Sequence, residues 1–123
     1  MRRIRGGAVQ PCAAPAPGEP VYIKHGSSAF IGTALEADLR KRGLTGVVIA
    51  GGAANYCVET TARMAGNLGF DTVVVGDALL NFGQTAPGGR TFPARDVLEM
   101  TLANLSDEFA RIATTEQVLA ELG

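Results

Sequence analysis

The 123-residue sequence has very few of the side chains that bind metals or form disulfides. It contains a single histidine, His25, and neither a C-x-x-C nor an H-x-x-x-H spacing, which argues against a zinc site. Two cysteines, Cys12 and Cys57, are too few for a disulfide framework. We therefore expect two free thiols in a reducing, cytoplasmic setting, and no metal or other cofactor.

An excess of charge of one sign and long apolar runs are also lacking. The net charge is −1, which gives no general attraction to nucleic acid or to an anionic membrane. No apolar run is long enough to span a bilayer, and the N-terminus lacks the apolar core of a secretory signal. The short basic cluster "MRRIR" is expected to be a solvated tail. Nucleic acid and membranes are therefore not expected as partners.

The composition is that of one folded domain. Hydrophobic residues make up 46% of the chain and charged residues 19%, so a substantial core is expected. Residues 1–20 carry four of the six prolines and show no periodicity, which predicts an extended leader. The folded domain is accordingly expected over residues 21–123.

The apolar pattern predicts four strands, each followed by a helix. The strands are expected at residues 21–24, 45–52, 70–78 and 108–114, and the helices at residues 33–43, 55–68, 94–106 and 114–122. The strands at 45–52 and 70–78 are continuously apolar, as in a parallel sheet covered on both faces. This order predicts an α/β domain with a mainly parallel sheet, and residues 79–93 are expected to be a loop.

Two of the predicted helices carry a capping-box pattern. Thr33 and Glu36 stand at the start of the first helix, and Thr114 and Gln117 at the start of the last. Gly43 and Gly69 are placed to end the first and second helices.

Three polar or glycine-containing segments follow predicted strands. Lys24, residues 51–57 and the pair Gly76-Asp77 should therefore meet at the carboxyl edge of the sheet, where α/β folds bind ligands.

Cys57 falls in the first turn of a predicted helix. Free backbone N–H groups and the helix dipole favour a thiolate there, a nearby lysine adds to the effect, and the same N–H groups suit an oxyanion. Position alone leaves other interpretations open. Cys57 can be an ordinary buried cysteine and Lys24 a solvated charge, and the two glycines at 51–52 can cradle a phosphate, although no nucleotide-binding motif is present.

The stretches "SSAFIGTALEADLR", "GGAANYCVETTARMA" and "VVVGDA" resemble the isochorismatase-like cysteine hydrolases, and the resemblance extends from about residue 6 to the C-terminus. It implies a three-layer α/β/α fold of Rossmann-like topology with a six-stranded parallel sheet in the order 3-2-1-4-5-6. This chain would supply the last four strands in sequence order and would be truncated at the N-terminus.

The resemblance also implies an activity, the hydrolysis of an amide or related C–N bond in a small molecule. Cys57 falls on the family's nucleophile and Lys24 on its lysine, while the N–H groups of Ala53 and Cys57 fall on the oxyanion hole. A cis peptide is implied at Gly52–Ala53. Family substrates include nicotinamide, carbamoyl and ureido compounds and vinyl ethers. The candidate substrate-wall residues are Phe30, Tyr56, Asn81 and Phe82.

The family's catalytic aspartate has no counterpart, because the only acidic residue before Lys24 is Glu19. Asp77 matches a structural position instead. The two missing strands would leave the strand at 45–52 with an open apolar edge. The chain can therefore be part of a longer hydrolase, a protein that pairs with another copy as a homo-oligomer, or a non-catalytic, self-associating relative.

Overall fold

The computed structural model describes residues 11–122. The basic cluster at residues 1–5 and the first half of the expected leader lie outside the described residues. The rest of the leader is exposed and includes a short 3₁₀ helix, Pro11–Ala13. Among the described helices, none is both long and apolar enough to cross a membrane.

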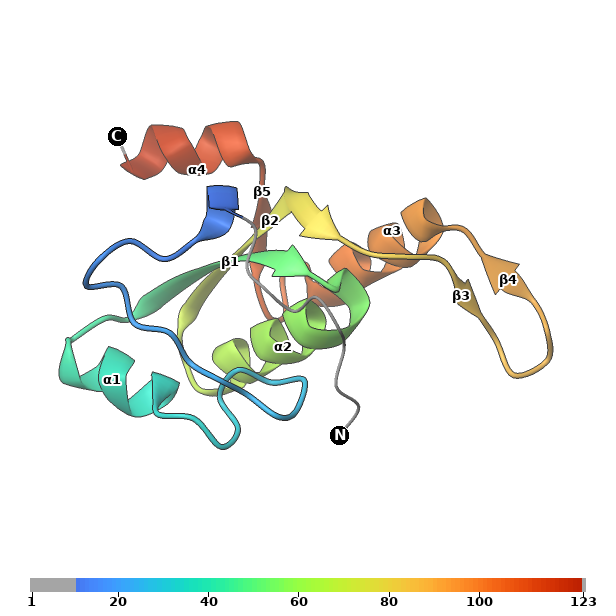
Figure 1. The fold of residues 1–123 in the computed structure, drawn as a ribbon. Helices are drawn as coiled ribbons and strands as arrows, with labels where there is room; N and C mark the ends of the chain where they lie inside the picture. Colours follow the sequence, from blue (N-terminus) through green and yellow to red (C-terminus); the bar gives the residue numbers. More distant parts are fainter. Residues whose placement is uncertain (1–10, 123) are drawn as a thin grey trace.

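Three parallel strands form the central sheet (Figure 1). They are β1 (Gly46–Gly52), β2 (Asp71–Leu80) and β5 (Arg111–Ala113), in the order β1-β2-β5. Val48 pairs with Val73, and Val74 pairs with Ile112. The parallel sheet predicted from the apolar runs is confirmed.

Helices cover both faces of this sheet (Figure 1). On one face, Val58, which directly precedes α2 (Glu59–Asn67), packs on Val74 together with Ala62 of α2 and Leu105 of α3 (Ala94–Leu105). On the other face, α4 (Thr115–Leu122) places Val118 against Val73, Val75 and Ala113. Consecutive residues of β2 thus supply the two halves of the core, because side chains alternate along a strand. The predicted three-layer α/β/α architecture is confirmed.

The predicted strand at residues 21–24 is not formed. Val21 and Ile23 are 67% and 75% exposed, and β1 pairs only with β2 within the described chain. A strand needs a neighbour for its backbone hydrogen bonds, and this segment has none. The expectation that both faces of the strand at 45–52 are covered is also wrong, since Val48 is 52% exposed. The open apolar edge expected there is present.

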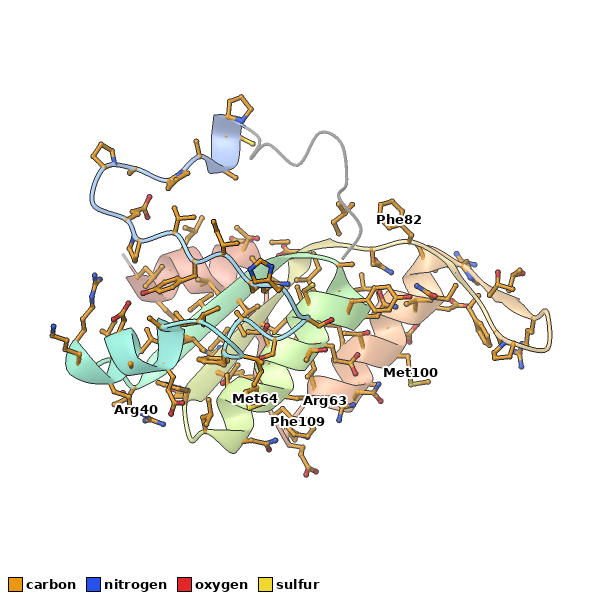
Figure 2. All side chains as sticks on the ribbon, turned by 60° about the horizontal axis from the view of Figure 1, so that its bottom comes forward. Arg40, Arg63, Met64, Phe82, Met100 and Phe109 are labelled. Atoms are coloured by element: carbon orange, nitrogen blue, oxygen red, sulfur yellow. The ribbon has the colours of Figure 1, made fainter. Side chains whose placement is uncertain are left out.

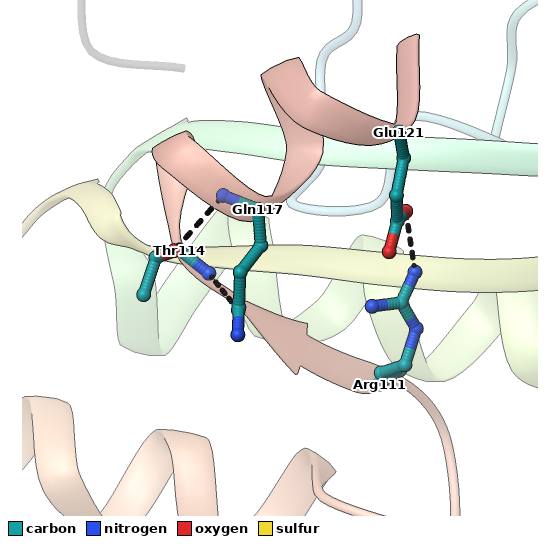
Figure 3. Close-up of polar contacts among 4 residues, drawn as sticks. All are labelled: Arg111, Thr114, Gln117 and Glu121. Carbon is teal, nitrogen blue, oxygen red and sulfur yellow. Dashed lines mark hydrogen bonds and ion pairs between the residues drawn. The ribbon is translucent and has the colours of Figure 1, made fainter.

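The two capping boxes have different outcomes. Thr114 and Gln117 form theirs, because each backbone N–H donates to the other's side chain, at 2.9 and 3.1 Å (Figure 3). The predicted box of Thr33 and Glu36 is not formed. The helix α1 (Leu35–Lys41) begins after Thr33, whose hydroxyl bonds to Ala29 and Leu35, while Glu36 pairs with Arg40.

The segment predicted as a loop at residues 79–93 contains regular structure. Its first two residues complete β2, and β3 (Gln84–Thr85) and β4 (Thr91–Phe92) then form an antiparallel hairpin. The hairpin extends away from the sheet in Figure 1. These strands are only two residues long, too short to leave a periodic signal in the sequence.

Candidate active site

The chain turns sharply between β1 and α2. The Gly52–Ala53 peptide bond is cis, and the next residues, Ala54–Val58, form a single π-helical turn before α2 begins. The Ala53 carbonyl accepts hydrogen bonds from the N–H groups of Tyr56 and Val58, at 3.1 and 3.2 Å. Cys57 therefore stands on a wide turn at the carboxyl end of β1, a kind of turn that is frequent at functional sites. The helix predicted at residues 55–68 is thus π-helical at its start.

Lys24 and Cys57 meet at this turn. The Nζ atom of Lys24 is 3.0 Å from the Sγ atom of Cys57 and also donates to the Gly26 carbonyl at 2.9 Å. Both residues are half-buried. The Lys24 ammonium group is therefore within hydrogen-bonding distance of the Cys57 sulfur.

A cavity of about 190 Å³ opens beside the pair. Its lining is mostly apolar: Lys24, Ala29, Ile49, Ala50, Gly52, Cys57, Val58 and Thr61. No aspartate or glutamate is among these residues. The cavity offers room for a small group next to the sulfur, and Lys24 is the one charged residue that lines it within residues 11–122.

The segment that carries Lys24 is attached to the helices by side-chain hydrogen bonds. The Tyr22 hydroxyl donates to Asp38 of α1 at 2.6 Å, and this bond raises the pKa of Tyr22. Thr61 of α2 accepts from the Ala29 N–H at 3.0 Å. Thr61 was not among the candidate residues, because its partners lie 32 and 34 positions away and no local pattern marks such a contact.

The four candidate wall residues lie in different surroundings. Phe30 stacks on Phe70 with ring centroids 5.8 Å apart, and Asn81 donates to the Ala94 carbonyl at 2.8 Å at the base of the hairpin. Tyr56 is 52% exposed and its hydroxyl donates to Gln84. Phe82 is 66% exposed (Figure 2). Tyr56 and Phe82 therefore remain free to touch a ligand, whereas Phe30 and Asn81 are engaged in packing and in the hairpin.

Leu80 lies beside the turn and was not singled out from the sequence. It pairs with Gly52 in the sheet register and is 62% exposed. A Cβ atom at position 52 would lie 3.1 Å from the Leu80 carbonyl oxygen. The glycine therefore lets β2 approach the turn closely.

Asp77, which was expected at the carboxyl edge of the sheet, is hydrogen-bonded to the start of α4. Asp77 accepts two hydrogen bonds from Thr115, which hold the pKa of its carboxyl below the ordinary value. Within residues 11–122, no group of three or more His, Cys, Asp or Glu residues is placed to hold a metal ion.

Comparison with known proteins gives a consistent result. The Isochorismatase domain family matches residues 3–117. The isochorismatase family protein YrdC of Bacillus subtilis, which is uncharacterised, is 41% identical over 114 residues, covering 93% of this chain and 61% of the relative. The ureidoacrylate amidohydrolase RutB of Variovorax paradoxus is 39% identical over 72 residues, covering 58% of this chain and 29% of that enzyme.

The fold is similar to that of solved members. A crystal structure of an isochorismatase-family protein from Chromobacterium violaceum superposes with a TM-score of 0.92 at 45% identity, covering 96% of this chain and 61% of that one. The chain thus spans 61% of the length of both the Bacillus relative and this structure. Sequence and fold agree over nearly all of its residues, and the chain belongs to the isochorismatase family.

Proposed function

We propose that this chain carries the nucleophile-bearing part of a cysteine hydrolase that cleaves an amide-type C–N bond in a small molecule. The observation that carries the proposal is the 3.0 Å contact between Lys24 and Cys57 beside a small cavity. A structural cysteine in the core needs no cation and no adjoining space, whereas a nucleophile uses both.

The proposed reaction has two stages. The Cys57 thiolate attacks the substrate carbonyl, and the N–H groups of Ala53 and Cys57 stabilise the oxyanion that forms. The C–N bond then breaks, and the departing nitrogen takes up a proton to leave as an amine or ammonia. Water next attacks the thioester, which releases the carboxylic acid and restores the thiol.

Proton delivery to the leaving nitrogen is the weak step. A protonated carboxyl group would serve as the general acid, and among the described residues no aspartate or glutamate lines the cavity. Because groups that act together lose most of their effect when one is absent, turnover by this chain by itself is expected to be slow. The first stage, which needs only the thiolate and the oxyanion donors, is expected to be retained.

The substrate class is an amide or a ureide. RutB, with which residues of this chain align, is a ureidoacrylate amidohydrolase, and a mostly apolar cavity of about 190 Å³ suits a small acyl group. Tyr56, Phe82 and Leu80 are exposed and would contact the rest of the substrate.

Trapping the acyl-enzyme tests this proposal. The folded chain is incubated with nicotinamide and with carbamoyl and ureido compounds, and the Cys57 peptide is examined by mass spectrometry for an acyl adduct. Adducts are expected in the starting protein and in Cys12→Ala, and none in Cys57→Ala. If no compound of the panel acylates Cys57, and it alkylates no faster than Cys12, the proposal is rejected.

A second candidate function is self-association without catalysis. It is favoured by the open edge of β1, where Val48 is 52% exposed beside a free row of backbone groups. Such an edge can pair with the same edge of another copy. Substitution of Lys24 or Cys57 distinguishes the two candidate functions, because hydrolysis needs both residues and self-association needs neither.

A further inference from the structure

Lys24 is held next to Cys57 by a segment that has no regular secondary structure. Residues 21–33 are irregular, with bends and turns but no helix or strand, and the one backbone–backbone hydrogen bond that this segment donates within the described residues, from Ile31 to Ser28, is internal. Neither a sheet nor a helix therefore fixes where the lysine lies. The position of its ammonium group must depend on side-chain contacts with the rest of the chain.

Thr61 makes such contacts with the segment's backbone. Its hydroxyl accepts a hydrogen bond from the Ala29 N–H at 3.0 Å and donates to the Ser27 carbonyl at 3.5 Å. One hydroxyl thereby uses its donor and an acceptor site on two backbone groups of the same segment. Ser28, between these two residues, is 5% exposed, so the contact lies at the point where the segment enters the interior.

Thr61 also lies close to the proposed nucleophile, Cys57. It lies four residues after Cys57, and side chains at this spacing share one face of a helix. Thr61, Lys24 and Cys57 all line the same cavity. Thr61, which holds the segment, and Cys57, which Lys24 contacts, are thus about one helical turn apart in the chain.

We infer that Thr61 is a positioning residue, which fastens the segment over α2 so that Lys24 reaches Cys57. This inference rests on the proposed function, because it assigns to Thr61 an effect exerted through Lys24. Removing the hydroxyl leaves the Ala29 N–H without its acceptor, and the segment then shifts toward water to satisfy it. The lysine is only three residues before Ser27, so it moves with that shift.

The test measures how fast iodoacetamide alkylates Cys57 at pH 7 in the native full chain, with Cys12 as the internal reference. Thr61→Val keeps the volume and removes the hydroxyl. It is expected to slow Cys57 by about tenfold, close to the effect of Lys24→Met, because the charge-assisted contact is lost in both. Thr61→Ser is expected to restore the rate.

A double variant separates positioning from general stability. In the Lys24→Met background, Thr61→Val is expected to slow Cys57 no further, since its effect passes through the missing lysine. Thr60→Val on the same helix forms neither contact with the segment and serves as the matched control, expected to keep the starting rate. Thr61→Ala is measured alongside, so that the result does not depend on how well valine fits.

Three outcomes overturn the inference. One is a Thr61→Val or Thr61→Ala rate equal to that of the starting protein while Lys24→Met is slow, which leaves the proposed function standing. Another is an equal slowing by Thr61→Val with and without Lys24, which shows a purely structural role. The last is a Lys24→Met rate equal to the starting rate, which removes the proposed function together with the inference.

Discussion

The carboxylate of Asp77 on β2 accepts two hydrogen bonds from Thr115, the first residue of α4, one from the backbone N–H and one from the hydroxyl, both at 2.8 Å. These bonds connect the central strand with the start of the helix that covers it. They favour the ionised carboxylate, which is why the pKa of Asp77 is lowered. Asp77 therefore has a structural role where β2 meets α4.

Asp77→Asn is expected to lower the melting temperature in a pH-dependent way. The pKa of Asp77 is lower in the folded chain than its ordinary value of 3.8, so the carboxylate stabilises the fold above that pH. The stabilisation is lost as the pH falls through the folded-state value. Thermal melts followed by circular dichroism should show the gap between the two proteins at pH 6 and its closure well below pH 3.8. A gap that stays constant with pH contradicts this account, and Asp96→Asn, at an exposed position, is the control.

Lys24→Met is expected to slow the alkylation of Cys57 at pH 7 by about tenfold, because the ammonium group no longer stabilises the thiolate. Peptide-resolved mass spectrometry gives the rate, and Cys12 on the same chain should not change. Lys41→Met, which removes an exposed lysine of α1, is the matched control. Equal rates for Cys57 in all three proteins would show that the lysine does not activate the thiol.

Gly66→Ala is expected to destabilise the chain, although alanine usually favours a helix over glycine by about 1 kcal/mol. A Cβ atom at this position in α2 would lie 2.9 Å from the Phe109 carbonyl oxygen, so the loop after α3 must move. Overpacking of this kind costs about 1–3 kcal/mol, which outweighs the helix preference. Urea denaturation measures the change. Asn67→Ala in the same helix is exposed and should be neutral or slightly stabilising.

Phe109, against which Gly66 packs, also makes a contact with Arg63 that the substitution would disturb. The guanidinium carbon of Arg63 lies 4.9 Å from the centre of the Phe109 ring (Figure 2), and Arg63 also pairs with Glu59 at 3.1 Å. A displaced Phe109 would lose its cation–π contact. If Gly66→Ala proved as stable as the starting chain, the loop would have to be more compliant than this packing indicates.

Val48→Lys is expected to reduce self-association. A lysine on an open edge strand opposes pairing with another copy, because it brings like charges together. Light scattering across a range of protein concentrations should show oligomers for the starting chain and a smaller species for the variant. Leu119→Lys is the control, since Leu119 is also exposed but lies on α4. If both variants behave like the starting chain, the β1 edge is not the contact surface.

The parts of the fold that could be predicted are those with a local signature. The apolar run at residues 70–78 marks a central strand because both of its faces are buried, and Thr114 and Gln117 mark a helix start because the bonds they form are local. Residues 21–24 have the composition of a strand, but a strand also needs a partner, and composition does not report one. Thr61 gave no signal for the same reason, since its role depends on residues more than thirty positions away.

The hairpin of β3 and β4 ends in a turn that stands apart from the core. A Cβ atom at Gly88 or Gly89 would meet no neighbouring atom within 4 Å, and the Ala86 N–H bonds to the Arg90 carbonyl across the base of that turn. Exposed, glycine-rich loop tips are where proteins best accept inserted sequence. A fluorophore or affinity tag introduced between the two glycines should therefore leave the layers around Cys57 undisturbed. The turn is thus a suitable site for immobilising or labelling this chain in single-molecule experiments.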